Sequence, residues 1–397
     1  MARNGPAIPR YRATHAPALL QQGFRPFFLG AGLWAIAAMA LWLAELRGVA
    51  VLPAGLPGVA WHAHALLFGY LSAALAGFLL TAVPNWTGRM PLQGAPLAAL
   101  VTLWLAGRLA VLLLGGPALP VAAAIDVAFP LVLTVVIGRE IAAGRNWRNL
   151  PVLAGVAGLA AAQVLFWLGV LGEWSTAPAA RSGIAVFALL IALIGGRITP
   201  SFTRNWLKRQ GGTRFPVAAN AADRAILLGS VAALASWVVL PQHPVTAALC
   251  ALAAVAHLWR LSRWRGLATR GEPLLLVLHL GYLWLPVGLA LIAAAAVWPG
   301  LSPDVVWHAL TAGAMGTMTL AVMTRATRGH TGRPLSADRW TIALFAAVTA
   351  SAGLRLMAPL WPVLALELYA LSGALWIAAF ALFLLVYAPM LLGPKRT

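Results

Sequence analysis

Long apolar segments follow one another along the whole chain, separated by short stretches rich in proline, glycine and charged residues. A helix needs about 20 mostly apolar residues to cross the hydrocarbon core of a membrane. The sequence therefore predicts an all-α polytopic membrane protein with about twelve transmembrane helices, in one integral membrane domain (1–397) that begins with a short cytoplasmic tail (1–23). The predicted spans are 24–44, 61–83, 96–115, 119–138, 150–171, 182–200, 222–240, 243–260, 272–295, 304–325, 337–356 and 362–391.

Composition agrees with this interpretation, because 61% of the 397 residues are hydrophobic and only 9% are charged. A soluble domain has about 25% charged residues, so a soluble protein is excluded. The single cysteine, Cys250, excludes disulfide frameworks, thiolate zinc sites and iron–sulfur clusters. Any metal is then expected on histidine, or on methionine thioethers such as those of Met315, Met318 and Met323.

The 28 Lys and Arg residues outnumber the 9 Asp and Glu residues, giving a formal net charge of +19. In a soluble chain this would indicate nucleic-acid binding, but in membrane proteins basic residues collect on the cytoplasmic side. Twelve spans place Arg47, Arg181 and Arg355 on one side and Arg108 within a span, and the other 24 on the side of the N-terminus. We therefore expect both termini to be cytoplasmic, and no nucleic-acid partner.

Four ionisable side chains fall inside apolar runs, where a charge is costly and usually paired. Arg108 and Asp126 lie at similar distances on either side of a tight turn, and so do Arg355 and Glu367. The favoured interpretation is a structural ion pair between neighbouring helices in each case. The functional alternatives are that Arg108 binds a cofactor carboxylate, or that Asp126 and Glu367 relay protons.

An internal repeat relates the second and tenth spans, because residues 64–89 align with 308–333 without a gap. The sixth span ends in a faintly similar segment. Related spans at intervals of four predict three units of four helices, whereas many transporters have two six-helix halves. The shared features are the pairs His64/His308 and Gly69/Gly313, the closing Thr-Gly-Arg, and Trp61-His62 echoing Trp307-His308.

His64 and His308 lie at nearly the same depth, in the first turns of helices that enter from the outer side. A bis-histidine haem needs two imidazoles from different helices at one depth, so we expect His64 and His308 to be its axial ligands. His62 lies about 200° from His64 around a helix and so faces the other way, where it is a candidate ligand of copper or a contact of a haem propionate. For each histidine, the alternative is an interfacial residue without a ligand.

His279 lies seven residues into its span, and an ionisable side chain at that depth is a functional candidate. We therefore take His62 and His279 as the candidates for a metal site. A weaker alternative is that His257, in the preceding span, meets His279 at a second inner site. No ligand role is expected for the remaining histidines, which are His15, His243 and His330.

These residues resemble the NnrS family, and the resemblance extends over most of the chain. The resembling segments are 23–28 (GFRPFF), 61–64 (WHAH) through 83–88 (VPNWTG), 196–202 (GRITPSF), 278–282 (LHLGY), and 308–311 (HALT) through 323–333 (MTRATRGHTGR). One position departs from the family pattern: an acidic residue commonly follows the second histidine of the His-x-His motif, and here Ala65 stands there. A proton-transfer role for that carboxylate is therefore not expected in this chain.

The resemblance implies a multi-pass protein of the bacterial inner membrane that contains haem b and copper and acts in nitric oxide metabolism and nitrosative-stress tolerance. Its ligand would be NO or a related small molecule, and an NO-reducing oxidoreductase activity is one expectation. The layout is also similar to the catalytic subunit of haem–copper oxidases, although the sixth and seventh spans lack the histidines that bind copper there. Two other hypotheses stay open: a cofactor-free secondary transporter or exporter, and a b-type electron carrier that takes electrons from a quinol.

Overall fold

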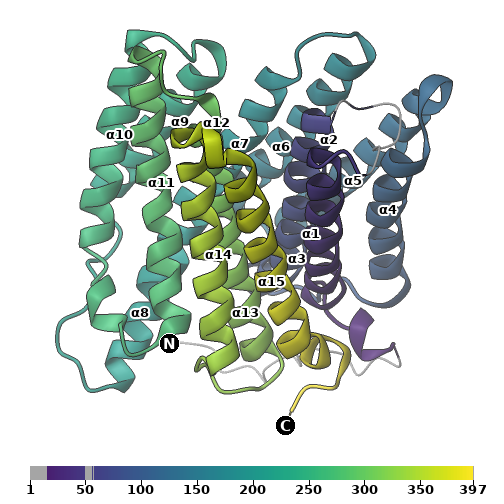
Figure 1. Cartoon of the computed structure of the whole chain (residues 1–397). Helices are drawn as coiled ribbons and strands as arrows, with labels where there is room; N and C mark the ends of the chain where they lie inside the picture. The colour runs from purple at the N-terminus through teal and green to yellow at the C-terminus, as the bar shows by residue number, and fades with distance from the viewer. Residues whose placement is uncertain (1–15, 50–55, 57, 397) are drawn as a thin grey trace.

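The computed structural model describes residues 16–49, 56 and 58–396, and these residues form helices and turns without any strand. Twelve helices among them are long and apolar enough to cross a membrane. Each coincides with one of the predicted spans, so the all-α, multi-pass architecture is confirmed. Figure 1 shows the helices running between two ends of the bundle. We call the end where α15 finishes at Leu392 the lower end, and the end where α12 starts at Pro303 the upper end.

The spans have the following bounds. The first four are α1 (Phe24–Leu46), the continuous α2 (Gly58–His64), η2 (Ala65–Tyr70) and α3 (Leu71–Thr87), then α4 (Gly94–Leu113) and α5 (Leu119–Ala143). The next four are α6 (Leu150–Leu171), the continuous α7 (Ala177–Leu190), η5 (Ile191–Gly195) and α8 (Gly196–Arg209), then α9 (Ala221–Val239) and α10 (Pro244–Ser262). The last four are α11 (Pro273–Val297), the continuous α12 (Pro303–His308), η7 (Ala309–Gly316) and α13 (Thr317–His330), then α14 (Arg339–Met357) and α15 (Ala365–Leu392). Single 3₁₀ turns are η1 (Ala18–Leu20), η3 (Gly116–Ala118), η4 (Trp147–Asn149), η6 (Gly266–Thr269), η8 (Ala358–Leu360) and η9 (Pro362–Leu364).

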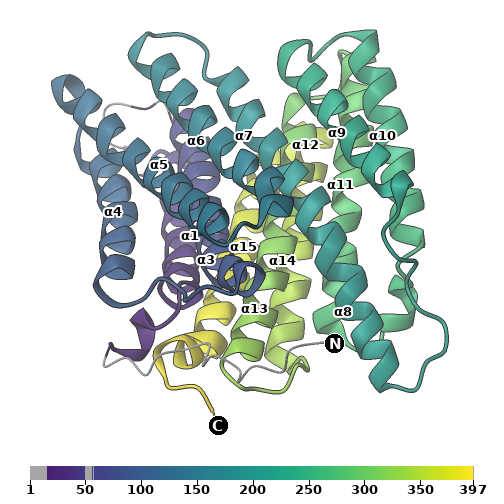
Figure 2. The same cartoon turned by 180° about the vertical axis from the view of Figure 1, so that it is seen from behind.

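The other helices pack around three central spans. At the junctions between the four-helix units, α5 packs against α6, α10 against α11, and α15 against α1; Figure 1 shows the last pair and Figure 2 the first. The second, sixth and tenth spans contact one another through η2 and α7, α7 and η7, and α3 and α13. The share of buried residues in the apolar part of these spans is 83%, 61% and 67%, against 33–61% in the other nine spans. This arrangement agrees with three four-helix units.

The same three central spans each contain a π-helical segment: η2, η5 and η7. In the gapless alignment of the second and tenth spans, η2 and η7 start at equivalent residues, Ala65 and Ala309. Because π-helix makes up well under 1% of residues in proteins and is frequent at functional sites, three such segments point to the centre of the bundle as the functional region.

Side chains from neighbouring spans donate hydrogen bonds to the carbonyls of η2. The donors are Trp34 Nε1 to Ala65 (2.8 Å), Trp104 Nε1 to Gly69 (3.0 Å) and Arg108 Nη1 to Phe68 (2.8 Å). Arg108 is fully buried and pairs with Asp126 of α5. The predicted ion pair between these two residues is therefore confirmed, and one role of the arginine is to satisfy the backbone of the π-segment.

A similar arrangement of an arginine and an aspartate occurs at η5 in the second four-helix unit. Arg260 of α10 donates to the carbonyl of Ala192 (2.8 Å) and pairs with Asp223 of α9 (2.8 Å). The arginine precedes the aspartate in the first unit and follows it in the second, so the charges are exchanged between the two helices. Gly196 allows the approach, because a Cβ there would lie 2.5–2.7 Å from the guanidinium of Arg260.

Candidate functional site

A cavity of about 430 Å³ is lined by residues of α2 and α12, among others. Figure 1 shows these two helices at the upper end. We name this cavity the histidine cavity, because His62 and His308 both line it. Its walls come from the first, second, sixth, tenth, eleventh and twelfth spans and are mainly apolar and aromatic. The aromatic side chains are Trp42, Tyr70, Trp307, Tyr369 and Trp376, and the charged ones are Asp304 and Arg355.

The imidazoles of His62 and His308 face each other across different spans. Their ring centroids are 6.3 Å apart and the ring planes differ by 17°. The two rings are therefore stacked. A metal ion lies in the plane of the imidazole that binds it, about 2.0 Å from the nitrogen, so these rings would have to rotate for both to bind one metal ion. The indole of Trp42 stacks on His62 at 4.6 Å and limits the directions in which that ring can lie.

A hydrogen bond fixes the tautomer of His308, whereas His62 has a nitrogen that is unpaired within the part of the chain that the structure describes. Nδ1 of His308 lies 2.8 Å from the carbonyl oxygen of Asp304. A carbonyl only accepts, so Nδ1 carries the proton and Nε2 keeps its lone pair, as in many metal-binding histidines. Nδ1 of His62 is buried and has no hydrogen-bond partner among the described residues. Because leaving a buried polar atom unpaired is costly, this nitrogen is a candidate contact for a ligand.

Arg355 supplies a positive charge to the histidine cavity. Its Nη2 lies 3.3 Å from Asp304 and its guanidinium stacks 4.1 Å above the ring of Tyr369. The predicted ion pair between Arg355 and Glu367 is wrong. Glu367 lies in the first turn of α15, and Arg355 pairs with Asp304 of the tenth span instead. Nη1 of Arg355 is buried and unpaired within the described part of the chain, which leaves a donor for an anionic group.

His64 does not line this cavity. Its side chain is 1% exposed, and its Nε2 lies 2.8 Å from the carboxylate of Asp126. Gln163 (2.6 Å) and Trp167 (2.7 Å) also donate to that carboxylate. The expected opposite orientation of His62 and His64 is thus observed, but the imidazole that faces His308 is that of His62. Ligation of haem by His64 stays a prediction.

His279 lies near the lower end, away from the histidine cavity. Its Nε2 lies 2.9 Å from Thr203 of α8, and Nδ1 faces Gly266 closely. A metal role for His279 stays a prediction. His257 does not join it, because its two nitrogens lie 2.8 Å from Ser230 and from Tyr282. Of the other histidines, His243 caps α10 and His330 packs on Phe24, while His15 lies outside the described residues.

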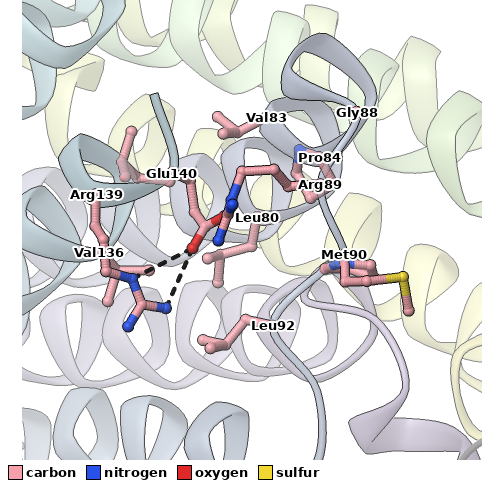
Figure 3. A pocket seen from close by; sticks show the side chains of 12 residues that line it. Leu80, Val83, Pro84, Gly88, Arg89, Met90, Leu92, Val136, Arg139 and Glu140 are labelled. Atoms are coloured by element: carbon pink, nitrogen blue, oxygen red, sulfur yellow. Dashed lines mark hydrogen bonds and ion pairs between the residues drawn. The ribbon is translucent and has the colours of Figure 1, made fainter. Parts of the chain in front are cut away.

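A second cleft of about 430 Å³ opens at the lower end between α3, the following loop and α5. Figure 3 shows apolar walls, with Arg89 and Arg139 on either side of Glu140. Both arginines bond to that carboxylate, at 2.6 and 3.1 Å. Two guanidinium groups and one carboxylate leave one net positive charge at this cleft, and no histidine is among its lining residues. The residues suited to holding a metal or haem therefore lie in the histidine cavity.

The sequence did not indicate three contributors to the histidine cavity: Trp42, Arg355 as a cavity residue, and Tyr369. One signal was present for Asp304, which precedes His308 by four residues and so lies one helical turn away. The echo of Trp61-His62 in Trp307-His308 also marked the pair that the fold brings together. Within the described residues, no group of three His, Cys, Asp or Glu side chains is placed to hold a metal ion.

In a comparison with protein families, the chain matches the family described as "NnrS protein" over residues 18–395. The comparison with curated proteins returned no match to the sequence.

Proposed function

Because the chain belongs to the NnrS family, a membership that fits a role in the nitric oxide response, we propose that it is a haem-binding membrane protein that binds NO. The observation that carries the proposal is the pairing of His62 and His308 at 6.3 Å inside one aromatic cavity. A haem held there by both imidazoles would supply an iron centre that exchanges electrons, and it would bind NO once one of the two imidazoles has left the iron.

The number of protein ligands favours haem over a bare copper ion in this cavity. Two imidazoles are available, and the described residues provide no third metal-binding side chain beside them. Haem iron already has four porphyrin nitrogens and needs one or two axial ligands from the protein. A copper ion would need further donors, and the carboxylate of Asp304, which lines the cavity, is paired with Arg355.

The other cavity residues suit a flat, apolar, anionic group. Five aromatic side chains provide surfaces for a macrocycle. The unpaired Nη1 of Arg355 is a donor for a carboxylate such as a haem propionate. The hydrogen bond from His308 to Asp304 holds that imidazole with Nε2 available. These residues would bind and orient the cofactor.

The haem and copper content of the purified full chain tests the proposal. We expect one b-type haem per chain, a Soret band that shifts when NO is added, and loss of that haem in Arg355→Ala or His308→Ala. The matched control is His243→Ala, because His243 lies at an exposed helix cap. Protein without haem that still folds and transports a solute would support the transporter hypothesis and refute this proposal.

A further inference from the structure

A narrow apolar cleft of about 80 Å³ lies among the three central spans. The second span contributes Ala74 and Phe78, and the sixth and tenth spans contribute residues that include η5 and the start of α13. The second, sixth and tenth spans are among the most buried of the chain. The cleft therefore lies among the central spans of the bundle.

The cleft continues the histidine cavity towards the lower end. Tyr70 lines the histidine cavity, and Ala74, one helical turn further along the same span, lines the cleft. The other two central spans repeat this step of about 5 Å, from Ile184 to Phe187 and from Ala312 to Met315. The hydroxyl of Tyr70 bonds to Thr319 of the cleft, so the two spaces meet at this hydrogen bond.

The lining leaves almost no polar atoms for a ligand. Thr319 is the one hydroxyl side chain that lines the cleft, and it donates to the carbonyl of Met315 at 2.6 Å. A buried water needs two to four polar partners, and a charged ligand needs a counter-ion. The cleft offers neither. It does offer the thioethers of Met315, Met318 and Met323, which are polarisable and favour dispersion contacts.

We propose that this cleft is a binding site for small uncharged gas molecules and that it feeds the histidine cavity. A volume of about 80 Å³ admits a diatomic molecule or a xenon atom, and dry apolar cavities in proteins bind such guests. The site itself stands on the cleft's shape and chemistry. Its role as a supply route rests on the proposed function.

Xenon is the probe, because it binds by dispersion and reports position through anomalous scattering. Crystals of the full chain under xenon pressure should show a xenon peak between Ala74, Ile191 and Met318. Val322→Phe and Ile198→Phe place a ring at two part-buried lining positions, and each should remove the peak. The matched control is Val135→Phe on the outer face of α5, where the side chain is 70% exposed, and it should keep the peak.

A second readout tests the supply route. In the haem-loaded protein, Val322→Phe should slow rebinding of carbon monoxide after photolysis and leave the Soret maximum unchanged, while Val135→Phe changes neither. No xenon peak in the wild type, an acyl chain in the cleft, or equal xenon peaks in all variants would overturn the site. Unchanged rebinding in folded Val322→Phe would overturn the supply route. Xenon in a protein that carries no haem would support the gas site and refute the proposed function.

Discussion

At the scale of residues, the two histidines of His62-Ala63-His64 have different partners because they point to opposite faces of one helix. The spacing of two residues is enough to predict that the two histidines have different partners, because it places them about 200° apart around the helix. Which of them faces His308 depends on where Asp126 and Trp42 lie in three dimensions. The spacing of residues along the chain does not predict these contacts between distant helices. The gapless repeat pairs His64 with His308, whereas the fold pairs His62 with it.

The Arg108–Asp126 pair gives a stability prediction. Asp126→Ala should destabilise the folded chain by about 3–5 kcal/mol, because it leaves a fully buried arginine without its counter-ion. Arg108→Met combined with Asp126→Leu should cost less than the sum of the two single variants, because no buried charge is left without its counter-ion. The remaining cost is the loss of hydrogen bonds to the Phe68 carbonyl and from the side chains that donate to Asp126. Thermal unfolding in detergent, followed by tryptophan fluorescence, measures both. A double variant as unstable as the sum of the two single variants would contradict this account.

At the scale of elements, the hydrophobic pattern of the sequence does not predict the three π-helical segments η2, η5 and η7. Hydrophobic periodicity distinguishes a helix from a strand, but one extra residue in a turn leaves the pattern nearly unchanged. What specifies η5 is a partner far away in the sequence, Arg260, whose guanidinium reaches the carbonyl of Ala192.

Gly196 tests the link between η5 and Arg260. Gly196→Ala should destabilise the protein by about 1–3 kcal/mol, because the new Cβ would push the guanidinium away. The matched control is Gly229→Ala in α9, where a Cβ meets nothing within 4 Å. This change should stabilise the helix by up to about 1 kcal/mol. Thermal unfolding shifts of opposite sign are expected, and equal shifts would contradict the role assigned to Gly196.

The start of α14 gives a pH-dependent prediction. Asp338 caps this helix by accepting from Thr341 N (2.8 Å), and it pairs with Arg328. Partial burial alone would raise the pKa of this carboxyl, but these contacts outweigh it and lower the pKa below 3.8. A lowered pKa means that the carboxylate stabilises the fold above about pH 4 and loses this effect as the pH falls further.

Asp338→Ala should therefore lower the unfolding temperature at pH 7, with the loss of the cap costing about 1 kcal/mol. The difference from the wild type should shrink below about pH 4, and melting curves between pH 7 and pH 3 measure it. A difference that stays constant down to pH 3 would show that the carboxylate charge does not contribute.

At the scale of the whole molecule, hydropathy predicted all twelve spans because lipid requires every span to be long and apolar. The pairing of helices around the central spans and the shape of the histidine cavity depend on side-chain packing, which composition does not encode. The orientation in the membrane stays a prediction from the 24 cationic residues on the side of the N-terminus.

Cysteine labelling tests that orientation, because the one natural cysteine, Cys250, is buried. Thr213→Cys lies in the loop between α8 and α9 at the lower end, and Ser175→Cys lies between α6 and α7 at the upper end, both at exposed positions. In spheroplasts, a membrane-impermeant maleimide should label Ser175→Cys and should label Thr213→Cys only after lysis. The reverse pattern would contradict cytoplasmic termini.

The most direct test of the central claim is the absorption spectrum of three purified histidine variants. If His62 and His308 hold a b-type haem, the wild-type Soret band should disappear in His62→Ala and His308→Ala and persist in His64→Gln, which keeps a hydrogen-bonding side chain beside Asp126. A Soret band lost in folded His64→Gln and retained in His62→Ala would contradict the claim.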